Sequence, residues 1–252
     1  MMTFLPQDAQ AGAKPKAAKR AAYTVPSDIS FPESPLWEAK PIDAAVGARL
    51  GYVSCSADNG CCHAAFYAIA GQMAEKYGKP YSDMPWHVMV GGRGGVGGWG
   101  SICGALLGAA LAFSLFYQDR DHKEMVRELF HWYNNTSLPM YRPGTDVYVD
   151  KDIPQSVSGS VLCHISNAKW AYVSGYRVNS KERSERCARL TADVAHKAIE
   201  ILNAKIAGTF DCSVKAIPTP RCDAAGNVEY AESTGDAVIL VRKPEFRALK
   251  VG

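Results

Sequence analysis

The residues with the clearest chemistry in this chain are its cysteines, of which there are eight in 252 residues. Thiolates bind zinc, iron and iron–sulfur clusters, and paired thiols form disulfides or carry redox chemistry. No apolar signal segment opens the sequence, so we expect a cytoplasmic protein, or a periplasmic one if an export segment was removed. In a reducing compartment, many thiols indicate metal or redox chemistry. The cysteines are Cys55, Cys61, Cys62, Cys103, Cys163, Cys187, Cys212 and Cys222.

The spacing of these cysteines does not by itself define a site. Cys61 and Cys62 are adjacent, and Cys103, Cys163 and Cys187 are single and far apart. No pair has the Cys-x-x-Cys spacing of a zinc knuckle or a thioredoxin site. A single cysteine is also common in a protein core as a small hydrophobic residue. Only convergence of four of them in space would make a metal centre.

Two histidines, His63 and His164, directly follow a cysteine, as in the heme-attachment motif Cys-x-x-Cys-His. The position of the first cysteine is occupied by Asn59 in one case and by Ser160 in the other. The sequence therefore predicts no covalently attached heme c, while non-covalent heme stays open. Each histidine is a candidate proton donor in an enzyme or a residue with a structural hydrogen bond.

A glycine-rich loop precedes one of the cysteines: seven of the ten residues from Gly91 to Gly100 are glycine. No Gly-Lys-Ser/Thr follows, as a phosphate-binding loop requires, and no parallel-sheet pattern surrounds the loop, as a dinucleotide site requires. We favour a third interpretation, in which glycines let the backbone approach a bulky group ahead of a helix. Cys103 would lie in the first turn of that helix, where free amides and the helix dipole favour a thiolate or an anionic cluster.

Helical periodicity dominates the chain and predicts a mainly α fold, a single-domain bundle of about five helices with a small irregular C-terminal extension. Ser101 is the expected N-cap of the second helix, Gly175 the stop of the fourth, and Asn179 or Ser180 the cap of the fifth. Two strand-like runs follow. The expected helices are 61–77, 101–117, 121–136, 156–174 and 180–207, and the expected strands 227–231 and 236–241.

The predicted organisation has three parts: an extended tail and lead-in over 1–48, a helical domain over 49–208 and an extension over 209–252. Hydrophobic residues make up 47% of the chain and charged residues 21%, as in globular proteins. A net charge of +3 gives no support for nucleic-acid binding. The stretch 94–118 carries no charge, but its first half is mostly glycine, which is a poor helix former. We therefore predict a buried core helix there and no membrane span.

Four stretches resemble the split-Soret cytochrome c family, within the wider C_GCAxxG_C_C redox proteins: "GCCHAAFYAIAGQMAEKYGKPY", "GGVGGWGSICGALLGAALAFSLF", "SVLCHISNAKWAY" and "KERSERCARLTADVAHKAIEILNAKI". The resemblance covers about residues 50–208. It implies a helical, homodimeric electron-transfer protein with an iron–sulfur cluster beside its hemes. The family cysteines fall at Cys61, Cys103, Cys163 and Cys187, and the family relation favours [2Fe–2S], with [4Fe–4S] or an unusual cluster as alternatives.

The sequence departs from the family in its C-terminal segment, where "CSVKAIPTPRC" has no histidine after either cysteine. Cys55 and Cys62 are extra thiols, and either could replace a family ligand. Three functions are compatible with these features. The first is an iron–sulfur electron-transfer protein with an unidentified redox partner. The second is a reductase that uses the cluster or a thiol pair on a small substrate, and the third is a protein with structural zinc.

Overall fold

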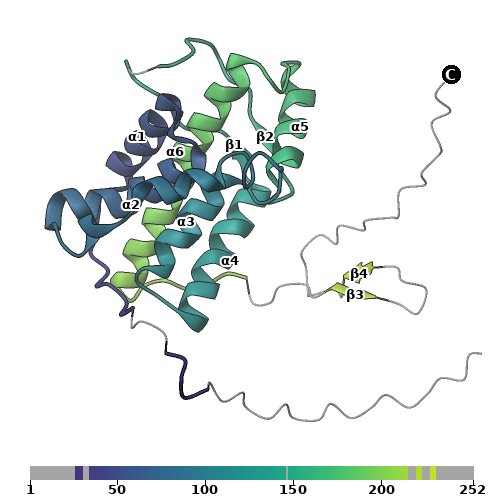
Figure 1. Cartoon of the computed structure of the whole chain (residues 1–252). Helices are drawn as coiled ribbons and strands as arrows, with labels where there is room; N and C mark the ends of the chain where they lie inside the picture. The colour runs from purple at the N-terminus through teal and green to yellow at the C-terminus, as the bar shows by residue number, and fades with distance from the viewer. Residues whose placement is uncertain (1–25, 31–33, 146, 215–219, 223–227, 231–252) are drawn as a thin grey trace, which may run out of the picture. The chain divides into compact units, whose positions relative to one another are not determined.

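The structure is a computed structural model that describes residues 26–30, 34–145, 147–214, 220–222 and 228–230 (Figure 1). The chain divides into two units, the first ending at Pro35 and the second beginning at Leu36. The described part of the first unit contains a turn in which the Ile29 N–H donates to the Pro26 carbonyl at 3.0 Å. Every helix among the described residues belongs to the second unit.

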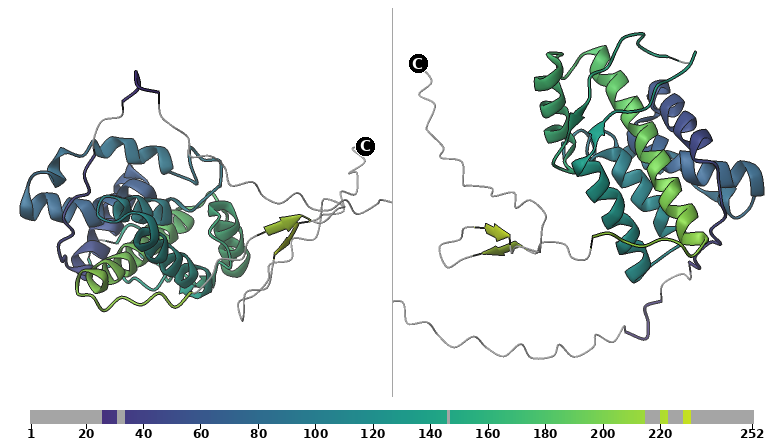
Figure 2. Two further views of the ribbon diagram at one scale, coloured as in Figure 1. Left: turned by 90° about the horizontal axis from the view of Figure 1, so that it is seen from below. Right: turned by 180° about the vertical axis from the view of Figure 1, so that it is seen from behind.

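Helices make up most of the described chain, so the predicted mainly α fold is confirmed (Figure 1). The long helix α6 contacts α1, α2, α3 and α4, and it runs diagonally across the bundle in the right-hand view of Figure 2. The α-helices are α1 (Ala44–Ser54), α2 (Cys61–Tyr77), α3 (Gly104–Ser114), α4 (Asp119–Asn135), α5 (Cys163–Ser174) and α6 (Lys181–Ile206). A π-helical turn spans Cys55–Asn59, and 3-10 helices span Tyr81–Asp83 and Trp86–Gly92.

Two small antiparallel pairs complete the described elements. β1 (Ser137–Leu138) pairs with β2 (Ser156–Val157), and β3 (Pro220–Cys222) pairs with β4 (Val228–Tyr230). β4 lies within the strand predicted over 227–231, whereas the strand predicted over 236–241 lies outside the described residues.

Helix α1 is the main difference from the predicted bundle of about five helices, because it begins inside the lead-in that was expected to be extended to residue 48. The Asp43 carboxylate caps it by accepting the N–H groups of Ala45 at 2.7 Å and Val46 at 3.0 Å. Gly47 faces α6 so closely that a Cβ there would overlap Ile199. Glycine at this position allows the contact with α6 but weakens the helical signal in the sequence.

Two other predicted helix starts were too early. Ser101 is not the N-cap of α3, because its hydroxyl donates to the Gly95 carbonyl at 2.9 Å, and Cys103 occupies the N-cap position. Helix α5 begins only at Cys163, since Ser156 and Val157 pair in β2 and Leu162 forms a bridge with Ile102. The expected end of α5 is confirmed at Gly175, whose φ of 74° is left-handed. The cap of α6 is Ser180, whose hydroxyl oxygen accepts the Arg183 N–H at 3.1 Å.

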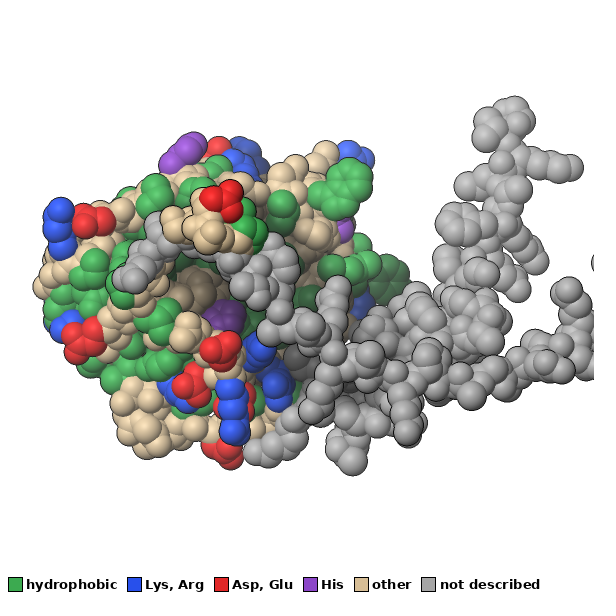
Figure 3. Space-filling model, turned by 60° about the horizontal axis from the view of Figure 1, so that its bottom comes forward, with side chains coloured by type: hydrophobic (Ala, Val, Ile, Leu, Met, Phe, Trp, Pro, Cys, Tyr) green, Lys and Arg blue, Asp and Glu red, His purple; other side chains and the backbone are tan. Residues whose placement is uncertain are grey.

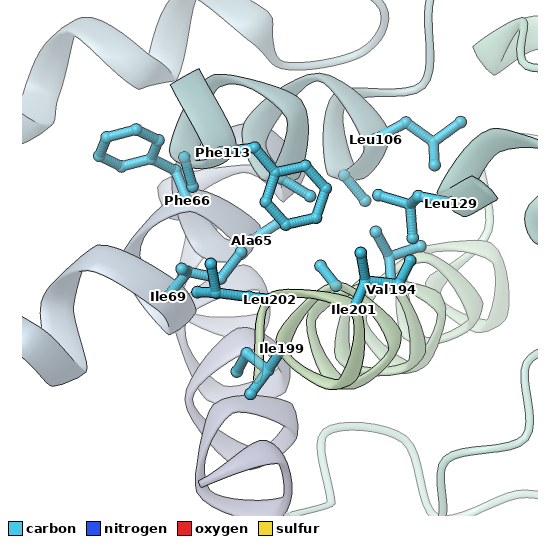
Figure 4. Packing of buried hydrophobic residues seen from close by; sticks show 14 of the residues in the cluster. Ala65, Phe66, Ile69, Leu106, Phe113, Leu129, Val194, Ile199, Ile201 and Leu202 are labelled. Atoms are coloured by element: carbon cyan, nitrogen blue, oxygen red, sulfur yellow. The ribbon is translucent and has the colours of Figure 1, made fainter. Parts of the chain in front are cut away.

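The apolar core lies where α2, α3, α4 and α6 meet (Figure 4). Small residues bring α2 and α3 together. A Cβ at Gly108 would overlap the Cys62 carbonyl oxygen, so only glycine allows this approach. Packing α3 on α2 in this way also fixes the start of α3 beside the start of α2. The labelled core residues in Figure 4 are Ala65, Phe66, Ile69, Leu106, Phe113, Leu129, Val194, Ile199, Ile201 and Leu202.

The surface carries mixed charge, and on the face drawn in Figure 3 Lys and Arg side chains lie among Asp and Glu side chains. None of the helices in the described ranges is long and apolar enough to cross a membrane. The apolar helix α3 has 11 residues, and most of them are buried.

A buried carboxylate, Asp193, ties α6 to the segment after β1. Its two oxygens accept the N–H groups of Met140 at 2.7 Å and Tyr141 at 2.8 Å. Burial raises the pKa of Asp193 from 3.8 to about 6, although these two N–H groups lower it. An acid with a raised folded-state pKa binds its proton more tightly in the folded protein.

Protonated Asp193 therefore stabilises the folded protein. We expect its contribution to the free energy of unfolding to be largest below pH 3.8 and to be lost as the pH rises through about 6. The shift corresponds to a loss on the order of 2 to 3 kcal/mol. Urea unfolding between about pH 3 and about pH 7, each about one unit beyond the expected window, would show this slope. The Asp193→Asn variant should lack it, and an equal slope in both proteins would contradict the assignment.

Candidate metal centre

Three of the four predicted ligand cysteines stand at the N-termini of helices. Cys61 is the first residue of α2 and Cys163 the first residue of α5, while Cys103 is the N-cap residue of α3. The amides of a first helical turn lack intrahelical acceptors, and the dipole there favours negative charge. The fourth cysteine, Cys187, comes from the second turn of α6. The sequence predicted Cys103 within the first turn of its helix, and it lies one position earlier.

A short backbone bridge brings two of these helix starts together. The Cys103 N–H donates to the Val161 carbonyl at 2.7 Å, and the Cys163 N–H donates to the Ser101 carbonyl at 2.6 Å. These bonds form an antiparallel bridge between Ile102 and Leu162. As a result, Cys103 and Cys163, which are sixty positions apart, enter their helices side by side.

All four predicted cysteines line one small internal cavity of about 20 Å³, which has room for about one water molecule. Three of them, Cys61, Cys163 and Cys187, also line an open cleft of about 870 Å³, so the space around the thiols continues toward solvent. The predicted convergence in space is therefore present, while the role of these residues as ligands stays a prediction. The other residues of the small cavity are Tyr133, Ser166, Asn167, Arg186, Leu190 and Thr191.

A fifth thiol, Cys55, joins the group from the π-helical turn. Its sulfur accepts a hydrogen bond from the Thr191 hydroxyl at 3.8 Å, and it lines the cleft with Cys61 and Cys187. Cys62 points elsewhere: it is 1% exposed and packs so tightly on Gly92 that a Cβ there would overlap its sulfur. Of the two extra thiols in the sequence, only Cys55 is therefore at the candidate site.

Burial raises the pKa of each thiol that shows a shift here. It raises the pKa of Cys55 and of Cys163 to about 12, and neighbouring thiols add to the effect. The pKa of Cys61 is raised well above its usual value, first by burial and then by Cys103. Cys55, Cys61 and Cys163 are therefore protonated at neutral pH when no metal is bound. Loading a metal must release these protons, because the metal ligand is the thiolate.

The glycine-rich loop covers Cys61 and the start of α5. Its backbone is left-handed at several positions, and the Gly94 N–H hydrogen-bonds to the Cys61 sulfur and lowers the pKa of that thiol. At Gly100, φ is 83° and a Cβ would overlap the His164 ring. At Gly100 the loop therefore approaches a side chain next to the thiols more closely than any other residue type would permit, while the approach to a bound cluster stays a prediction.

A network of buried polar side chains lies behind the thiols. Asn167 bridges two cysteines, since its Nδ2 donates to the Cys163 sulfur at 3.5 Å and its Oδ1 accepts from the Cys187 thiol at 3.4 Å. The Ser166 hydroxyl oxygen accepts both the Tyr133 hydroxyl at 2.8 Å and the Arg186 Nη2 at 2.7 Å. Sequence reasoning missed these residues. The available signal was position, because Asn167 is one turn after Cys163 and Arg186 directly precedes Cys187.

The two histidines singled out in the sequence occupy different surroundings. His164 lines the cleft beside Cys163. His63 lines neither cavity; its Nδ1 lies 3.3 Å from the Ser54 hydroxyl and its ring stacks on Tyr67. Burial lowers the pKa of His63, with a further contribution from His87. Only His164 is placed to act at the cleft.

Four cysteine thiols around one cavity are a donor set that an iron–sulfur cluster or a zinc ion would require. Within the described ranges, no group of three or more His, Cys, Asp or Glu side chains is gathered closely enough to hold one metal ion. An iron–sulfur cluster spreads its thiolate ligands over several irons, so its ligand sulfurs do not have to surround one centre. Thiols from four helices around a shared cavity fit that requirement, whereas the structural zinc alternative needs four thiolates around one ion.

Comparisons with known proteins identify relatives of this chain. The chain is 53% identical over 148 residues to split-Soret cytochrome c from Desulfovibrio desulfuricans. The matched region is 58% of this chain and 53% of that protein. The chain thus spans about half the length of this curated relative. A solved structure of split-Soret cytochrome c from the same organism, described as containing a novel iron centre, is similar with a TM-score of 0.68 and 44% identity. That match covers 75% of this chain and 78% of the solved one.

The model of the family "Putative redox-active protein (C_GCAxxG_C_C)" matches residues 60–201, a range that begins just before Cys61 and includes Cys103, Cys163 and Cys187. The chain therefore belongs to the C_GCAxxG_C_C redox-active protein family and is a relative of split-Soret cytochrome c.

Proposed function

We propose that this protein is an iron–sulfur redox protein that transfers electrons, with a cluster held by Cys61, Cys103, Cys163 and Cys187. The observation that carries the proposal is the convergence of these four thiols, from four helices, on one cavity. When bound, the cluster would supply one-electron redox chemistry. The protein supplies the four thiol ligands, the Gly94 N–H at one of them, and the polar network behind the others. We favour [2Fe–2S] because of the family relation.

The proposed protein uses the cluster without covalently attached heme c. Its relative is a cytochrome, but this sequence contains no Cys-x-x-Cys-His motif. The iron centre of the relative is therefore the feature that we transfer to this chain, and the covalent hemes are not.

The proposal is tested on protein purified under anaerobic conditions. We expect a brown protein with about two irons and two acid-labile sulfides per chain for [2Fe–2S], and visible absorbance that bleaches with dithionite. Zinc in place of iron would support the structural zinc alternative. Colourless protein without iron or sulfide, even after reconstitution with ferrous iron and sulfide, would overturn the proposal.

The cleft favours a second candidate function, a reductase that acts on a small substrate. Its volume of about 870 Å³ is that of a ligand pocket, and it reaches Cys55, Cys61, Cys163 and Cys187. His164 lines the same cleft and is the candidate proton donor. Turnover of a small substrate that falls in His164→Ala, with unchanged cluster absorbance, would support the reductase. The His63→Ala variant is the control, because His63 is outside the cleft.

We also propose a homodimer and a separate redox partner protein. Two large aromatic side chains are almost fully exposed: Trp99, in the glycine-rich loop, is 85% exposed, and Tyr172, on α5, is 91% exposed. Exposed aromatic residues next to a redox site are suited to protein contacts. Light scattering of the wild type and of a Trp99→Ser, Tyr172→Ser variant measures whether they hold a dimer together. The cytoplasmic location stays a prediction.

A further inference from the structure

Arg186 is a buried cation at the wall of the thiol cavity. Its side chain is 1% exposed, and it lines the cavity together with Cys103, Cys163 and Cys187. Its Nη2 donates to Ser166, but its Nε–H is buried and has no hydrogen-bond partner. A buried guanidinium with an unused donor indicates that a partner belongs beside it.

No carboxylate of the described residues forms an ion pair with Arg186. Arg186 takes part in none of the ion pairs within the described ranges. Asp193 acts on it through space, but the oxygens of Asp193 are bonded to Met140 and Tyr141. An isolated charge in a protein interior carries a large desolvation penalty unless it is paired.

The other buried arginine of α6, Arg189, is paired with a carboxylate. Arg189 lies three residues further along α6, and its Nε donates to Glu185 at 2.6 Å. Glu185 in turn accepts the Tyr52 hydroxyl at 3.0 Å and the Val149 N–H at 3.2 Å. Arg189 is therefore paired inside the protein, whereas Arg186 has thiols in the place where a carboxylate would stand.

We propose that Arg186 is the counter-ion of the thiolate-bound cluster and raises its reduction potential; this inference rests on the proposed iron–sulfur function. Four thiolates around the cavity supply the negative charge that Arg186 lacks. Addition of one electron from dithionite reduces one ferric ion to ferrous and increases the negative charge of the site by one. A fixed cation at the cavity wall stabilises the reduced form more than the oxidised form. Arg186 is thus a positioning and potential-setting residue rather than a ligand.

The test compares Arg186→Met, which removes the charge, with Arg186→Lys, which keeps it. The control is Arg183→Met, because Arg183 lies on the same helix and lines the cleft but not the small cavity. In an optical redox titration, we expect Arg186→Met to shift the reduction equilibrium at least tenfold toward the oxidised form, about 59 mV for one electron. Arg186→Lys and Arg183→Met should stay within about threefold of the wild type.

A second measurement compares thermal stability without and with the cluster. In iron-free protein with protonated thiols, Arg186 is an uncompensated buried cation, so Arg186→Met should unfold at the same temperature as the wild type or at a higher one. With the cluster bound, the same variant should unfold at a lower temperature. This reversal of sign would support the counter-ion, and the iron-free comparison alone tests it if Arg186→Met retains little iron.

Two results would overturn the inference. One is an unchanged reduction potential in Arg186→Met, and the other is strong destabilisation of iron-free Arg186→Met, which would make Arg186 a purely structural residue. If Arg186→Met does not fold at all, that outcome counts as the second result. A wild-type protein without a cluster would instead refute the proposed function itself, so the two failures are distinguishable.

Discussion

Replacing Cys61 with alanine is expected to remove most of the iron from the purified protein, whereas the same change at the adjacent Cys62 leaves the iron in place. Cys61 lines the cavity shared by the four predicted ligands, and Cys62 lies on the other side of the helix start, against Gly92. Loss of a residue that merely supports a ligand costs roughly 10- to 100-fold in metal affinity, so loss of a ligand should cost more. Iron and sulfide assays on anaerobically purified variants measure the difference.

The spare thiol Cys55 requires a second pair of variants. Cys55 lines the cleft with Cys61, and it can take the place of a missing ligand. We therefore expect the Cys55→Ala, Cys61→Ala double variant to lose iron more completely than Cys61→Ala, and Cys55→Ala alone to keep it. Iron at the wild-type level in the double variant, or its loss in Cys62→Ala, would contradict the assignment of Cys61.

Replacing Gly104 with alanine is expected to have the second-largest effect, although alanine is the better helix former by about 1 kcal/mol. Gly104 is the first residue of α3, and a Cβ there would overlap the Cys61 sulfur and lie 2.7 Å from the Gly92 carbonyl oxygen. Overpacking of this kind typically costs about 1 to 3 kcal/mol. It also displaces a predicted ligand, so iron content should fall together with stability.

The matched control for this variant is Gly91→Ala. A Cβ at Gly91 would have no neighbour within 4 Å, and the backbone there is not left-handed. We expect its thermal unfolding temperature and iron content to match the wild type. If Gly104→Ala is as stable and as iron-rich as Gly91→Ala, then close packing at the start of α3 does not position Cys61.

The sequence predicted the long helices well because their signals are local. The run from Cys61 to Tyr77 and the long helix that ends near Gly208 were recognised from apolar spacing, capping residues and terminating glycines. Helix α1 was missed because Gly47 and Gly51, which its contact with α6 requires, lower the helical signal of the segment. The N-terminus of α3 was placed two residues too early because Ser101 resembles a cap while its hydroxyl bonds within the glycine-rich loop.

The candidate site could be predicted only in part, because its residues are joined by tertiary contacts. The four predicted ligands came from the family resemblance, since no local spacing relates Cys61, Cys103, Cys163 and Cys187. Their meeting depends on the bridge between Ile102 and Leu162 and on the packing of α2 against α3. Whether Cys55 or Cys62 lies at the site depends on the direction in which its side chain points from the π-helical turn or from α2. These directions follow from the folded backbone and not from composition.

The most direct measurement is an anomalous difference map from crystals of the brown, anaerobically purified protein, with data collected at the iron absorption edge. The account predicts iron density in the cavity lined by Cys61, Cys103, Cys163 and Cys187, within bonding distance of their four sulfur atoms. Iron density at any other place, with these four sulfurs unligated, would contradict it.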